Sequence, residues 1–285
     1  MKYLIIGSKG QLGKEFVKIF NLYSYDFFAF DIDQIDINDY TKTKEIISYV
    51  KPNIVINCSA YNDVDNAELN PELAMTTNAY SVKNLAQICE QKNIFLIHYS
   101  SDYVFEGNKN YYKYDENDIP NPINNYGKSK LLGEEYIKET TNKYLIFRVS
   151  WVYGNGTQNF IYKFLNWSKK NKILRITNDE ISIPTSTTLI ANYTIKSINQ
   201  GLSGLFHLTN TGFASRYDWA LVITKLFKLQ NKIEQCSINE FNLPAKRPFF
   251  SAMNNTKISQ NINITTKDWQ DDFVEFVTNE YNAFC

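Results

Sequence analysis

The chain has few cysteines and histidines, and neither type is grouped as a metal site requires. Only four of the 285 residues are cysteine and two are histidine. The cysteines are scattered without the short spacings of metal sites; they are Cys58, Cys89, Cys236 and Cys285. His98 and His207 both fall in apolar runs typical of strands, where a structural role is the simpler interpretation. We therefore expect reduced thiols, a cytoplasmic protein and no metal site.

The sequence also lacks a long hydrophobic run and an excess of either charge. The apolar run at residues 3–6 is too short for a signal peptide, and no stretch resembles a membrane span. Acidic and basic residues balance at 30 each, so no overall field favours nucleic acid or an anionic membrane. Aromatic residues make up 15%, more than a disordered chain would contain. These features predict a globular protein without membrane insertion or nucleic-acid binding.

The N-terminal segment predicts a dinucleotide site. A short apolar strand at residues 3–6 runs into Gly7, Gly10 and Gly13, and a helical pattern then continues to about Phe20. Glycines at this spacing let the backbone turn tightly and approach a pyrophosphate at the helix N-terminus. An ordinary glycine-rich turn is the alternative, but the position between a strand and a helix favours the dinucleotide.

Asp31 bears on which dinucleotide is bound. It ends a second predicted strand, residues 26–30, and lies 18 residues beyond Gly13. An acidic residue near this point commonly binds the adenosine ribose hydroxyls, which favours NAD because a carboxylate repels a 2′-phosphate. Lys9 in the glycine turn could instead bind that phosphate, so NADH and NADPH both stay open.

Strands and helices alternate through the first half of the chain. We predict strands at 53–57, 93–99 and 144–149, and helices at 40–50, 72–92 and around 124–135. This alternation is typical of an α/β protein with a Rossmann-type doubly wound parallel sheet. Ligands of such sheets bind at the carboxyl ends of the strands, where residues 100–105 follow the fourth strand.

The regular alternation stops beyond residue 154. We predict helices at 159–170, 186–199, 215–229 and 267–282, and a strand at 204–208. No repeat, Pro/Gly-rich linker or low-complexity tract marks a boundary. The predicted division is a dinucleotide-binding domain at 1–150 and a smaller α/β substrate-binding lobe at 151–285, with segments of the lobe returning to the first domain.

The predicted helix at 124–135 places a tyrosine and a lysine on one face. Tyr126 and Lys130 are four residues apart, so their side chains project together. The unperturbed pKa of a phenol is near ~10, and a neighbouring ammonium lowers it toward neutral pH, as reduction of a carbonyl requires. Among 20 tyrosines about two such pairs arise by chance. The other pair, Tyr40 and Lys44, starts a helix without a neighbouring motif, so we assign it to the surface.

Several motifs, taken in their order along the chain, are far more specific than the spacing of Tyr126 and Lys130 alone. They are residues 7–13 (Gly-Ser-Lys-Gly-Gln-Leu-Gly), 60–68, 100–105, 126–130, 148–154, 183–185, 204–210 and 247–248. The set resembles the dTDP-4-dehydrorhamnose reductase family of the extended short-chain dehydrogenase/reductases. The resemblance covers almost the whole chain and is densest over the first 154 residues.

The resemblance implies a role for each matched residue. The implied catalytic set is Ser101, Tyr126 and Lys130, with Tyr126 as the proton donor and Lys130 holding the nicotinamide ribose. The implied contacts to the dinucleotide are Gly10, Gln11, Leu12, Asp36, Ile37, Ala60, Tyr61 and Asn62, in addition to Gly7, Gly13, Asp31 and the Tyr126–Lys130 pair. The implied substrate residues are Ser101, Asp102, Tyr103 and Trp151, although the two aromatics could instead belong to the core.

The implied activity is NAD(P)H-dependent reduction of the C4 keto group of a dTDP-4-keto-6-deoxyhexose. In this family it converts dTDP-4-dehydrorhamnose to dTDP-L-rhamnose for cell-surface polysaccharides, and a homodimer is compatible with it. The alternatives are another deoxysugar, a related nucleotide-sugar epimerase or dehydratase, and a non-catalytic dinucleotide-binding regulatory subunit. The complete Ser101, Tyr126 and Lys130 set argues against the last. Residues 179–182 depart from the family's Asp-Gln-x-Gly pattern, which bears on the sugar more than on the reaction.

Overall fold

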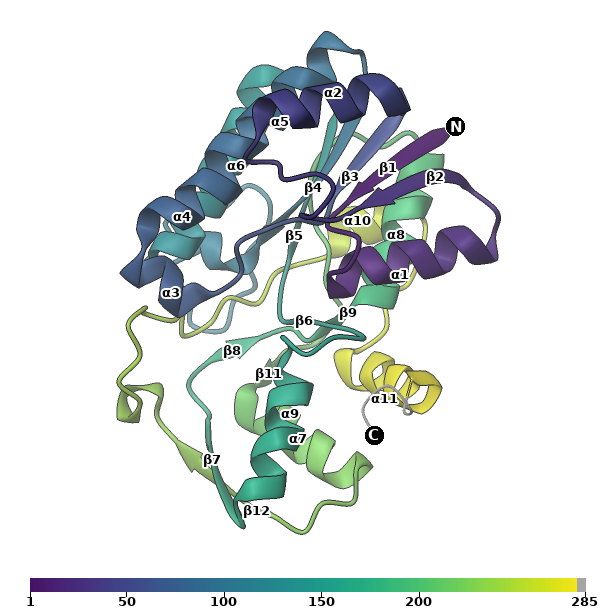
Figure 1. Cartoon of the computed structure of the whole chain (residues 1–285). Helices are drawn as coiled ribbons and strands as arrows, with labels where there is room; N and C mark the ends of the chain where they lie inside the picture. Colours follow the sequence, from purple (N-terminus) through teal and green to yellow (C-terminus); the bar gives the residue numbers. More distant parts are fainter. Residues whose placement is uncertain (281–285) are drawn as a thin grey trace.

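A six-stranded parallel sheet forms the centre of the larger part of the protein (Figure 1). The structure is a computed structural model that describes residues 1–280. The strands are β1 (Lys2–Ile6), β2 (Asp26–Phe30), β3 (Ile54–Asn57), β4 (Phe95–Ser101), β5 (Tyr144–Val149) and β10 (Gly204–His207). Their order is β10-β5-β4-β3-β1-β2, and every neighbouring pair is parallel. The predicted Rossmann-type sheet is confirmed, and its winding reverses between β1 and β3.

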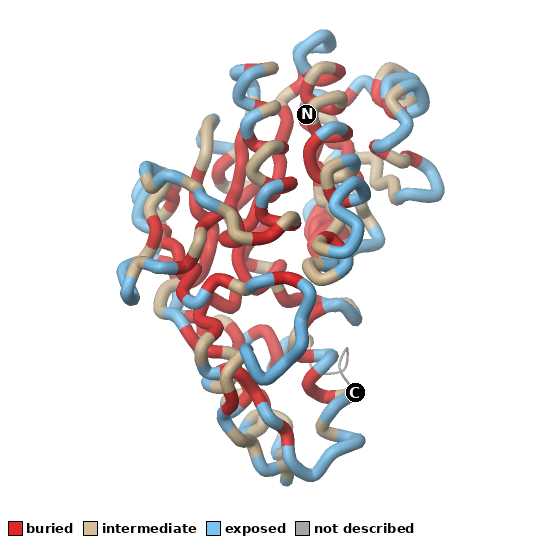
Figure 2. The backbone as a smooth tube through the Cα atoms, turned by 90° about the vertical axis from the view of Figure 1, so that its left-hand side faces the viewer, coloured by how far each residue is buried: buried red, intermediate tan, exposed pale blue. Residues whose placement is uncertain are grey.

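Helices cover both faces of this sheet. One layer contains α1 (Gln11–Leu22), α8 (Thr187–Asn199) and α10 (Thr256–Asn261), and the other contains α2 (Tyr40–Val50), α5 (Ser81–Gln91) and α6 (Asn125–Thr140). Successive side chains of β1 alternate between the layers: Tyr3 and Ile5 belong to the core of the first, and Leu4 and Ile6 to that of the second. Figure 2 shows the resulting band of buried backbone through the sheet. Burial on both faces explains why these strands are continuously apolar.

The helix predicted at 72–92 and the strand predicted at 93–99 differ from the elements in the structure. The predicted helix at 72–92 consists of α4 (Pro71–Met75), a π-helical turn (Thr76–Tyr80) and α5, preceded by α3 (Val64–Leu69). Asn78 lies in this π-helical turn, and its buried side chain forms hydrogen bonds with the backbone of Tyr61. The strand predicted at 93–99 begins two residues later, because Asn93 adopts a left-handed φ of 60° after α5.

The remaining elements form a smaller lobe below the carboxyl edge of the sheet. Its helices are α7 (Phe160–Lys170), α9 (Arg216–Leu226) and α11 (Trp269–Glu280). Its strands pair as β7 (Ile173–Thr177) with β12 (Lys232–Cys236), β8 (Ile181–Ser182) with β11 (Ala214–Ser215), and β6 (Val152–Tyr153) with β9 (Thr185–Ser186). Tyr153, Trp219 and Phe273 pack together in its core.

The helices predicted beyond residue 154 form close to the expected places. Side chains of Asn159 and Ser186 cap the starts of α7 and α8, and Ser215 forms a capping box with Asp218 at α9. The helix α9 ends at Leu226, three residues before the predicted end. The last two residues of the helix predicted at 267–282 lie outside the described residues, as does Cys285.

The structure describes three of the four cysteines and both histidines. Cys58, Cys89 and Cys236 are free thiols, and His98 and His207 are buried, which lowers the pKa of both imidazoles. Within residues 1–280, no group of three or more His, Cys, Asp or Glu side chains is arranged to bind a metal ion. Over the same range, every helix is too short or too polar to span a membrane.

Candidate active site

Gly7 and Gly13, in the turn after β1, have no space for a side chain. Gly7 has a φ of +79°, and a Cβ added there would lie 2.8 Å from the backbone nitrogen of Ser59. A Cβ added to Gly13 would lie 2.1 Å from the carbonyl oxygen of Gly7. Gly10, the N-cap of α1, has no side chain to bind the amides of the first turn. This close-packed turn, with its amides left to an anionic ligand, fits the pyrophosphate of a dinucleotide.

The neighbouring predicted residues are held by the fold in different ways. Leu12 and Ile37 are buried in the cores on opposite faces of the sheet. Gln11 donates from Nε2 to the carbonyl oxygen of Val152 at 3.1 Å, so it connects the glycine turn to the second lobe. The carboxylate of Asp36 accepts a hydrogen bond from the backbone nitrogen of Asn38.

Asp31 and Lys9 both lie at the end of the turn where an adenosine ribose would bind. The carboxylate of Asp31 accepts hydrogen bonds from the backbone nitrogens of Lys9 at 2.6 Å and Ile32 at 2.9 Å. The ammonium of Lys9 forms an exposed ion pair with Asp33 at 2.9 Å. The structure thus has a carboxylate and an ammonium within this loop, and the choice between NADH and NADPH stays a prediction.

The loop after β3 is connected directly to α6 through Asn78. This buried side chain accepts from the Tyr61 nitrogen at 2.8 Å and donates to the Tyr61 oxygen and to Ser129 Oγ, both at 3.0 Å. Ser129 lies on α6, so the bonds hold Ala60 and Asn62 beside that helix. Sequence reasoning did not identify Asn78 as a site residue, because a single polar residue in a helix gives no signal of its partners.

Tyr126 and Ser101 meet at the carboxyl edge of the sheet. Tyr126 is the second residue of α6, and Asn124 caps that helix by accepting from the Gly127 nitrogen at 2.8 Å. The Tyr126 hydroxyl donates to Asn62 Oδ1 at 3.5 Å and also interacts with the hydroxyl of Ser101, the last residue of β4. The hydroxyl groups of Tyr126 and Ser101 therefore lie near each other at this edge.

Lys130 lies on the same helix as Tyr126 and is buried. It is only 2% exposed, and its Nζ donates to the carbonyl oxygen of Tyr99 at 2.6 Å. Burial lowers the pKa of Lys130 to about 8 and raises the pKa of Tyr126 to about 12. The phenol of Tyr126 is therefore neutral at physiological pH. Burial is the largest influence on the pKa of Tyr126, and the lowering of this pKa that we expected from Lys130 stays a prediction.

The residues predicted to line the sugar site lie between the two lobes. Trp151 is 8% exposed, has a φ of +40°, and stacks on Trp219 with ring centroids 5.9 Å apart. The guanidinium of Arg216 lies 3.6 Å from the Trp151 ring centroid, and the indole nitrogen of Trp151 is buried without a hydrogen-bond partner. Tyr103 donates to Glu180 at 3.3 Å. The unpartnered indole N–H is a donor that a ligand could use.

Two of the residues that depart from the family pattern contact this region. Glu180 accepts from Tyr103 and lies 3.7 Å from Arg216, and Ser182 donates to the buried carboxylate of Asp102 at 2.8 Å. The departures therefore lie at the predicted sugar site.

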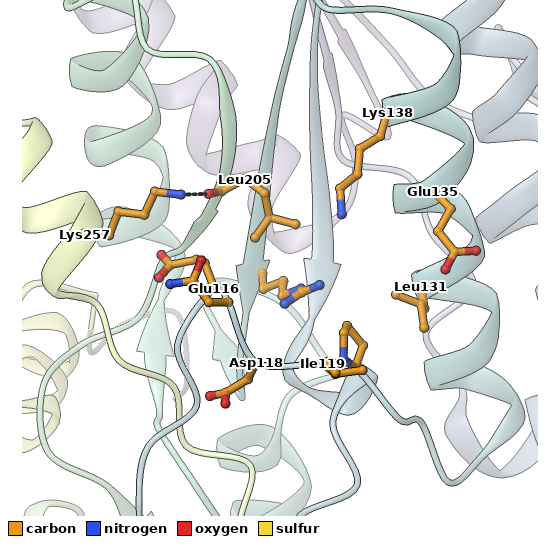
Figure 3. A pocket seen from close by; sticks show the side chains of 11 residues that line it. Glu116, Asp118, Ile119, Leu131, Glu135, Lys138, Leu205 and Lys257 are labelled. Atoms are coloured by element: carbon orange, nitrogen blue, oxygen red, sulfur yellow. Dashed lines mark hydrogen bonds between the residues drawn. The ribbon is translucent and has the colours of Figure 1, made fainter.

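A separate hollow of about 470 Å³ lies at the β10 edge of the sheet (Figure 3). It is lined by charged side chains, including Glu116 and Lys257, whose ammonium donates to the oxygen of Leu205 at 2.8 Å. None of the predicted site residues lines it. We therefore assign the candidate site to the carboxyl edge and not to this hollow.

A Rossmann-type sheet with a glycine turn, and with Ser101, Tyr126 and Lys130 buried at its carboxyl edge, defines an NAD(P)-dependent oxidoreductase of the short-chain type. Residues 1–282 match the family model of the RmlD substrate binding domain, and the chain belongs to this family. It is thus a nucleotide-sugar reductase that resembles dTDP-4-dehydrorhamnose reductase.

Similar proteins cover almost the whole chain. The dTDP-4-dehydrorhamnose reductase of Escherichia coli K12 is 33% identical over 95% of this chain and 95% of its own length. The spore coat polysaccharide biosynthesis protein SpsK of Bacillus subtilis is 31% identical over 99% of both chains. The crystal structure of dTDP-4-dehydrorhamnose reductase from Bacillus anthracis in complex with NADP has a TM-score of 0.94 at 32% identity, covering 98% of this chain and 99% of the other.

Proposed function

We propose that this protein reduces the C4 keto group of dTDP-4-dehydrorhamnose to give dTDP-L-rhamnose, in the cytoplasm, with NADPH or NADH. The nearness of the Tyr126 and Ser101 hydroxyls, at the end of β4 and the start of α6, carries the proposal. Similarity to the E. coli reductase along 95% of the chain supports this substrate. The B. anthracis structure with NADP supports a nicotinamide dinucleotide.

The protein side chains would divide the work as follows. The bound dinucleotide supplies the hydride, and the glycine turn holds its pyrophosphate. Tyr126 donates its proton to the carbonyl oxygen, and Ser101 orients that oxygen beside it. The buried ammonium of Lys130 holds the nicotinamide ribose and helps to restore the proton of Tyr126. Asp102, Tyr103 and Trp151 line the sugar.

A different deoxysugar is the second candidate for the substrate. SpsK is nearly as similar as the E. coli reductase, and the contacts of Glu180 and Ser182 are at the predicted sugar site. A nucleotide-sugar epimerase would regenerate its bound dinucleotide, whereas a reductase consumes it. Net oxidation of NADPH with dTDP-4-dehydrorhamnose, with the product identified by NMR, separates these possibilities.

Substitution of Tyr126 tests the catalytic assignment. Tyr126→Phe removes the proton donor but keeps the ring volume, so NADPH should still bind while turnover falls by about 10²–10⁴. Lys130→Met should weaken both NADPH binding and turnover, because the ammonium has a role in each. The measurement is single-turnover oxidation of bound NADPH by the keto-sugar.

A matched control exists in the chain. Tyr40 and Lys44 have the same spacing, and the ammonium of Lys44 lies 5.5 Å from the Tyr40 ring centroid. Tyr40→Phe should leave turnover unchanged. Full hydride transfer in the Tyr126→Phe protein would refute the assignment of Tyr126 as the proton donor.

A further inference from the structure

The carboxylate of Asp102 is buried and accepts hydrogen bonds from three serine hydroxyls. Asp102 is 2% exposed and follows the last residue of β4. Ser101 donates to its Oδ1 at 3.0 Å, and Ser182 and Ser251 donate to its Oδ2 at 2.8 and 2.6 Å. Ser182 lies on β8, and Ser251 is 149 residues away in the sequence. The carboxylate therefore joins the end of β4 to two later segments of the chain.

These bonds determine where the proton of Ser101 points. A serine hydroxyl has one donor position and two acceptor positions. Ser101 donates to Asp102, and its oxygen accepts from the backbone nitrogen of Tyr103 at 3.1 Å. While this arrangement lasts, Ser101 has no proton to donate to a carbonyl oxygen bound beside Tyr126.

We propose that Asp102 is a positioning residue that controls whether Ser101 donates a hydrogen bond to the substrate carbonyl. The ionised carboxylate holds the proton of Ser101. A neutral carboxyl instead donates one hydrogen bond itself, and the hydroxyl of Ser101 is then free to turn toward the carbonyl oxygen. A second donor beside Tyr126 stabilises the negative charge that develops on this oxygen. This inference rests on the proposed reduction.

The surroundings of Asp102 bring its pKa into a pH range in which the enzyme can be assayed. Burial raises the pKa of Asp102 to about 6, although the serine hydroxyls and the charge of Arg216 on α9 act in the opposite direction. Arg216 in turn lies 3.7 Å from Glu180. Burial raises the pKa of the nearby phenols of Tyr103 and Tyr126, which both stay neutral near pH 6. Near pH 6 the carboxyl group of Asp102 therefore changes its charge while both phenols stay neutral.

The test is the pH dependence of single-turnover oxidation of bound NADH by dTDP-4-dehydrorhamnose. NADH is the cofactor to use, because the 2′-phosphate of NADPH titrates near ~6 itself. The rate in the native protein should rise as the pH falls through about 6, the pKa of Asp102. Asp102→Asn carries a permanent donor, so its rate should match the native acid limit and lose its pH dependence. A pH-dependent or strongly slowed Asp102→Asn protein would overturn the proposal.

A second variant keeps the test valid if Asp102→Asn does not fold. Ser251→Ala removes one donor to the ionised carboxylate, so the midpoint should move up by about one pH unit. Ser197→Ala is the matched control: it removes a buried hydroxyl that donates to the Tyr193 oxygen at 2.7 Å, and the midpoint should not move. An unmoved midpoint in Ser251→Ala would overturn the proposal.

An infrared titration supplies a readout that does not depend on activity. The carboxyl C=O stretch of a protonated buried Asp should appear near pH 6 and be absent from Asp102→Asn. Its absence from the native protein would overturn the inference, as would a flat rate profile in an active enzyme. No oxidation of NADH or NADPH at any pH would instead refute the proposed function, and the inference with it.

Discussion

Removing the charge of Glu134 tests how α6, the helix with Tyr126 and Lys130, is held against the sheet. The Glu134 side chain is 0% exposed and that of Arg148 on β5 is 2% exposed. Arg148 donates to both carboxylate oxygens, at 2.8 and 2.7 Å. Burial alone would raise the pKa of Glu134, but the hydrogen bonds and charge of Arg148 outweigh it and hold the pKa below its ordinary value. The pair is therefore ionised in the folded protein.

Glu134→Gln keeps the shape of the side chain but leaves the Arg148 guanidinium buried without a counter-charge. Breaking a buried pair in this way costs about 3–5 kcal/mol. Two unit charges about 4 Å apart at an effective dielectric constant of about 20 attract by about 4 kcal/mol, which is the same size. This loss is a large part of the about 5–15 kcal/mol that stabilises a typical domain.

The assay is urea unfolding at pH 7, followed by far-UV circular dichroism and by tryptophan fluorescence. All four tryptophans lie after residue 150, so fluorescence reports on the later half of the chain and circular dichroism on the whole molecule. Glu275→Gln is the surface control: Glu275 pairs with Lys267, both side chains are about half exposed, and the expected loss is below about 0.5 kcal/mol. A loss below about 1 kcal/mol in Glu134→Gln would refute the reasoning.

The pH dependence gives a second check on this pair. Because folding lowers the pKa of Glu134, its contribution to stability is present above the unfolded pKa near 4.5 and is lost as the pH falls through the folded value. The native protein and Glu134→Gln should therefore converge in stability in acid. A difference that stays constant below pH 4.5 would contradict this assignment.

Three further predictions concern the cofactor, the sugar and the packing of α6. Because Asp31 ends β2, NADH should be accepted at least comparably with NADPH, and absolute dependence on NADPH in steady-state assays would contradict this role for Asp31. Trp151→Ala should raise KM for the sugar nucleotide and leave the Kd of NADPH nearly unchanged. An equal loss of affinity for the sugar nucleotide and for NADPH would show that Trp151 is only a core residue. A Cβ at position 133 would lie 2.2 Å from the backbone carbonyl oxygen of Asn78. Gly133→Ala should therefore destabilise the protein by about 1–3 kcal/mol, even though alanine favours helices more than glycine does. An unchanged Tm would show that α6 can shift away from the π turn at no cost.

The sheet could be predicted from the sequence because its signals are local. The strands that open the chain are short apolar runs, and Gly7, Gly10 and Gly13 mark a turn that the structure shows to be close-packed. The spacing of Tyr126 and Lys130 indicates a shared helix face, and both residues lie on α6. Such features depend on neighbours within about ten residues, so one sequence is enough to reveal them.

The polar contacts that position the site could not be predicted in the same way. Asp102 and Ser251 are 149 residues apart, and Asn78 and Ser129 are 51 apart. Each is a single polar residue without a periodic pattern, and its partner is decided only when distant segments pack. Four two-residue strands were not predicted for a similar reason: β6, β8, β9 and β11. Each is defined by the strand it pairs with and not by its own sequence. The direction of the Tyr126 pKa also depends on burial, which spacing does not show.

The place of β10 at the edge of the sheet affects how the protein is made. The ribosome releases the N-terminal strands first, yet β10, which pairs with β5, spans residues 204–207. Until that segment emerges, β5 is an unpaired edge, and the sheet face that α8 covers is exposed to water. The nascent chain therefore needs protection from aggregation while about 50 residues of the second lobe are synthesised. A fragment ending at residue 150 would keep this exposed edge permanently, so proteolysis or premature termination near Trp151 should yield an aggregating product and not a free dinucleotide-binding domain.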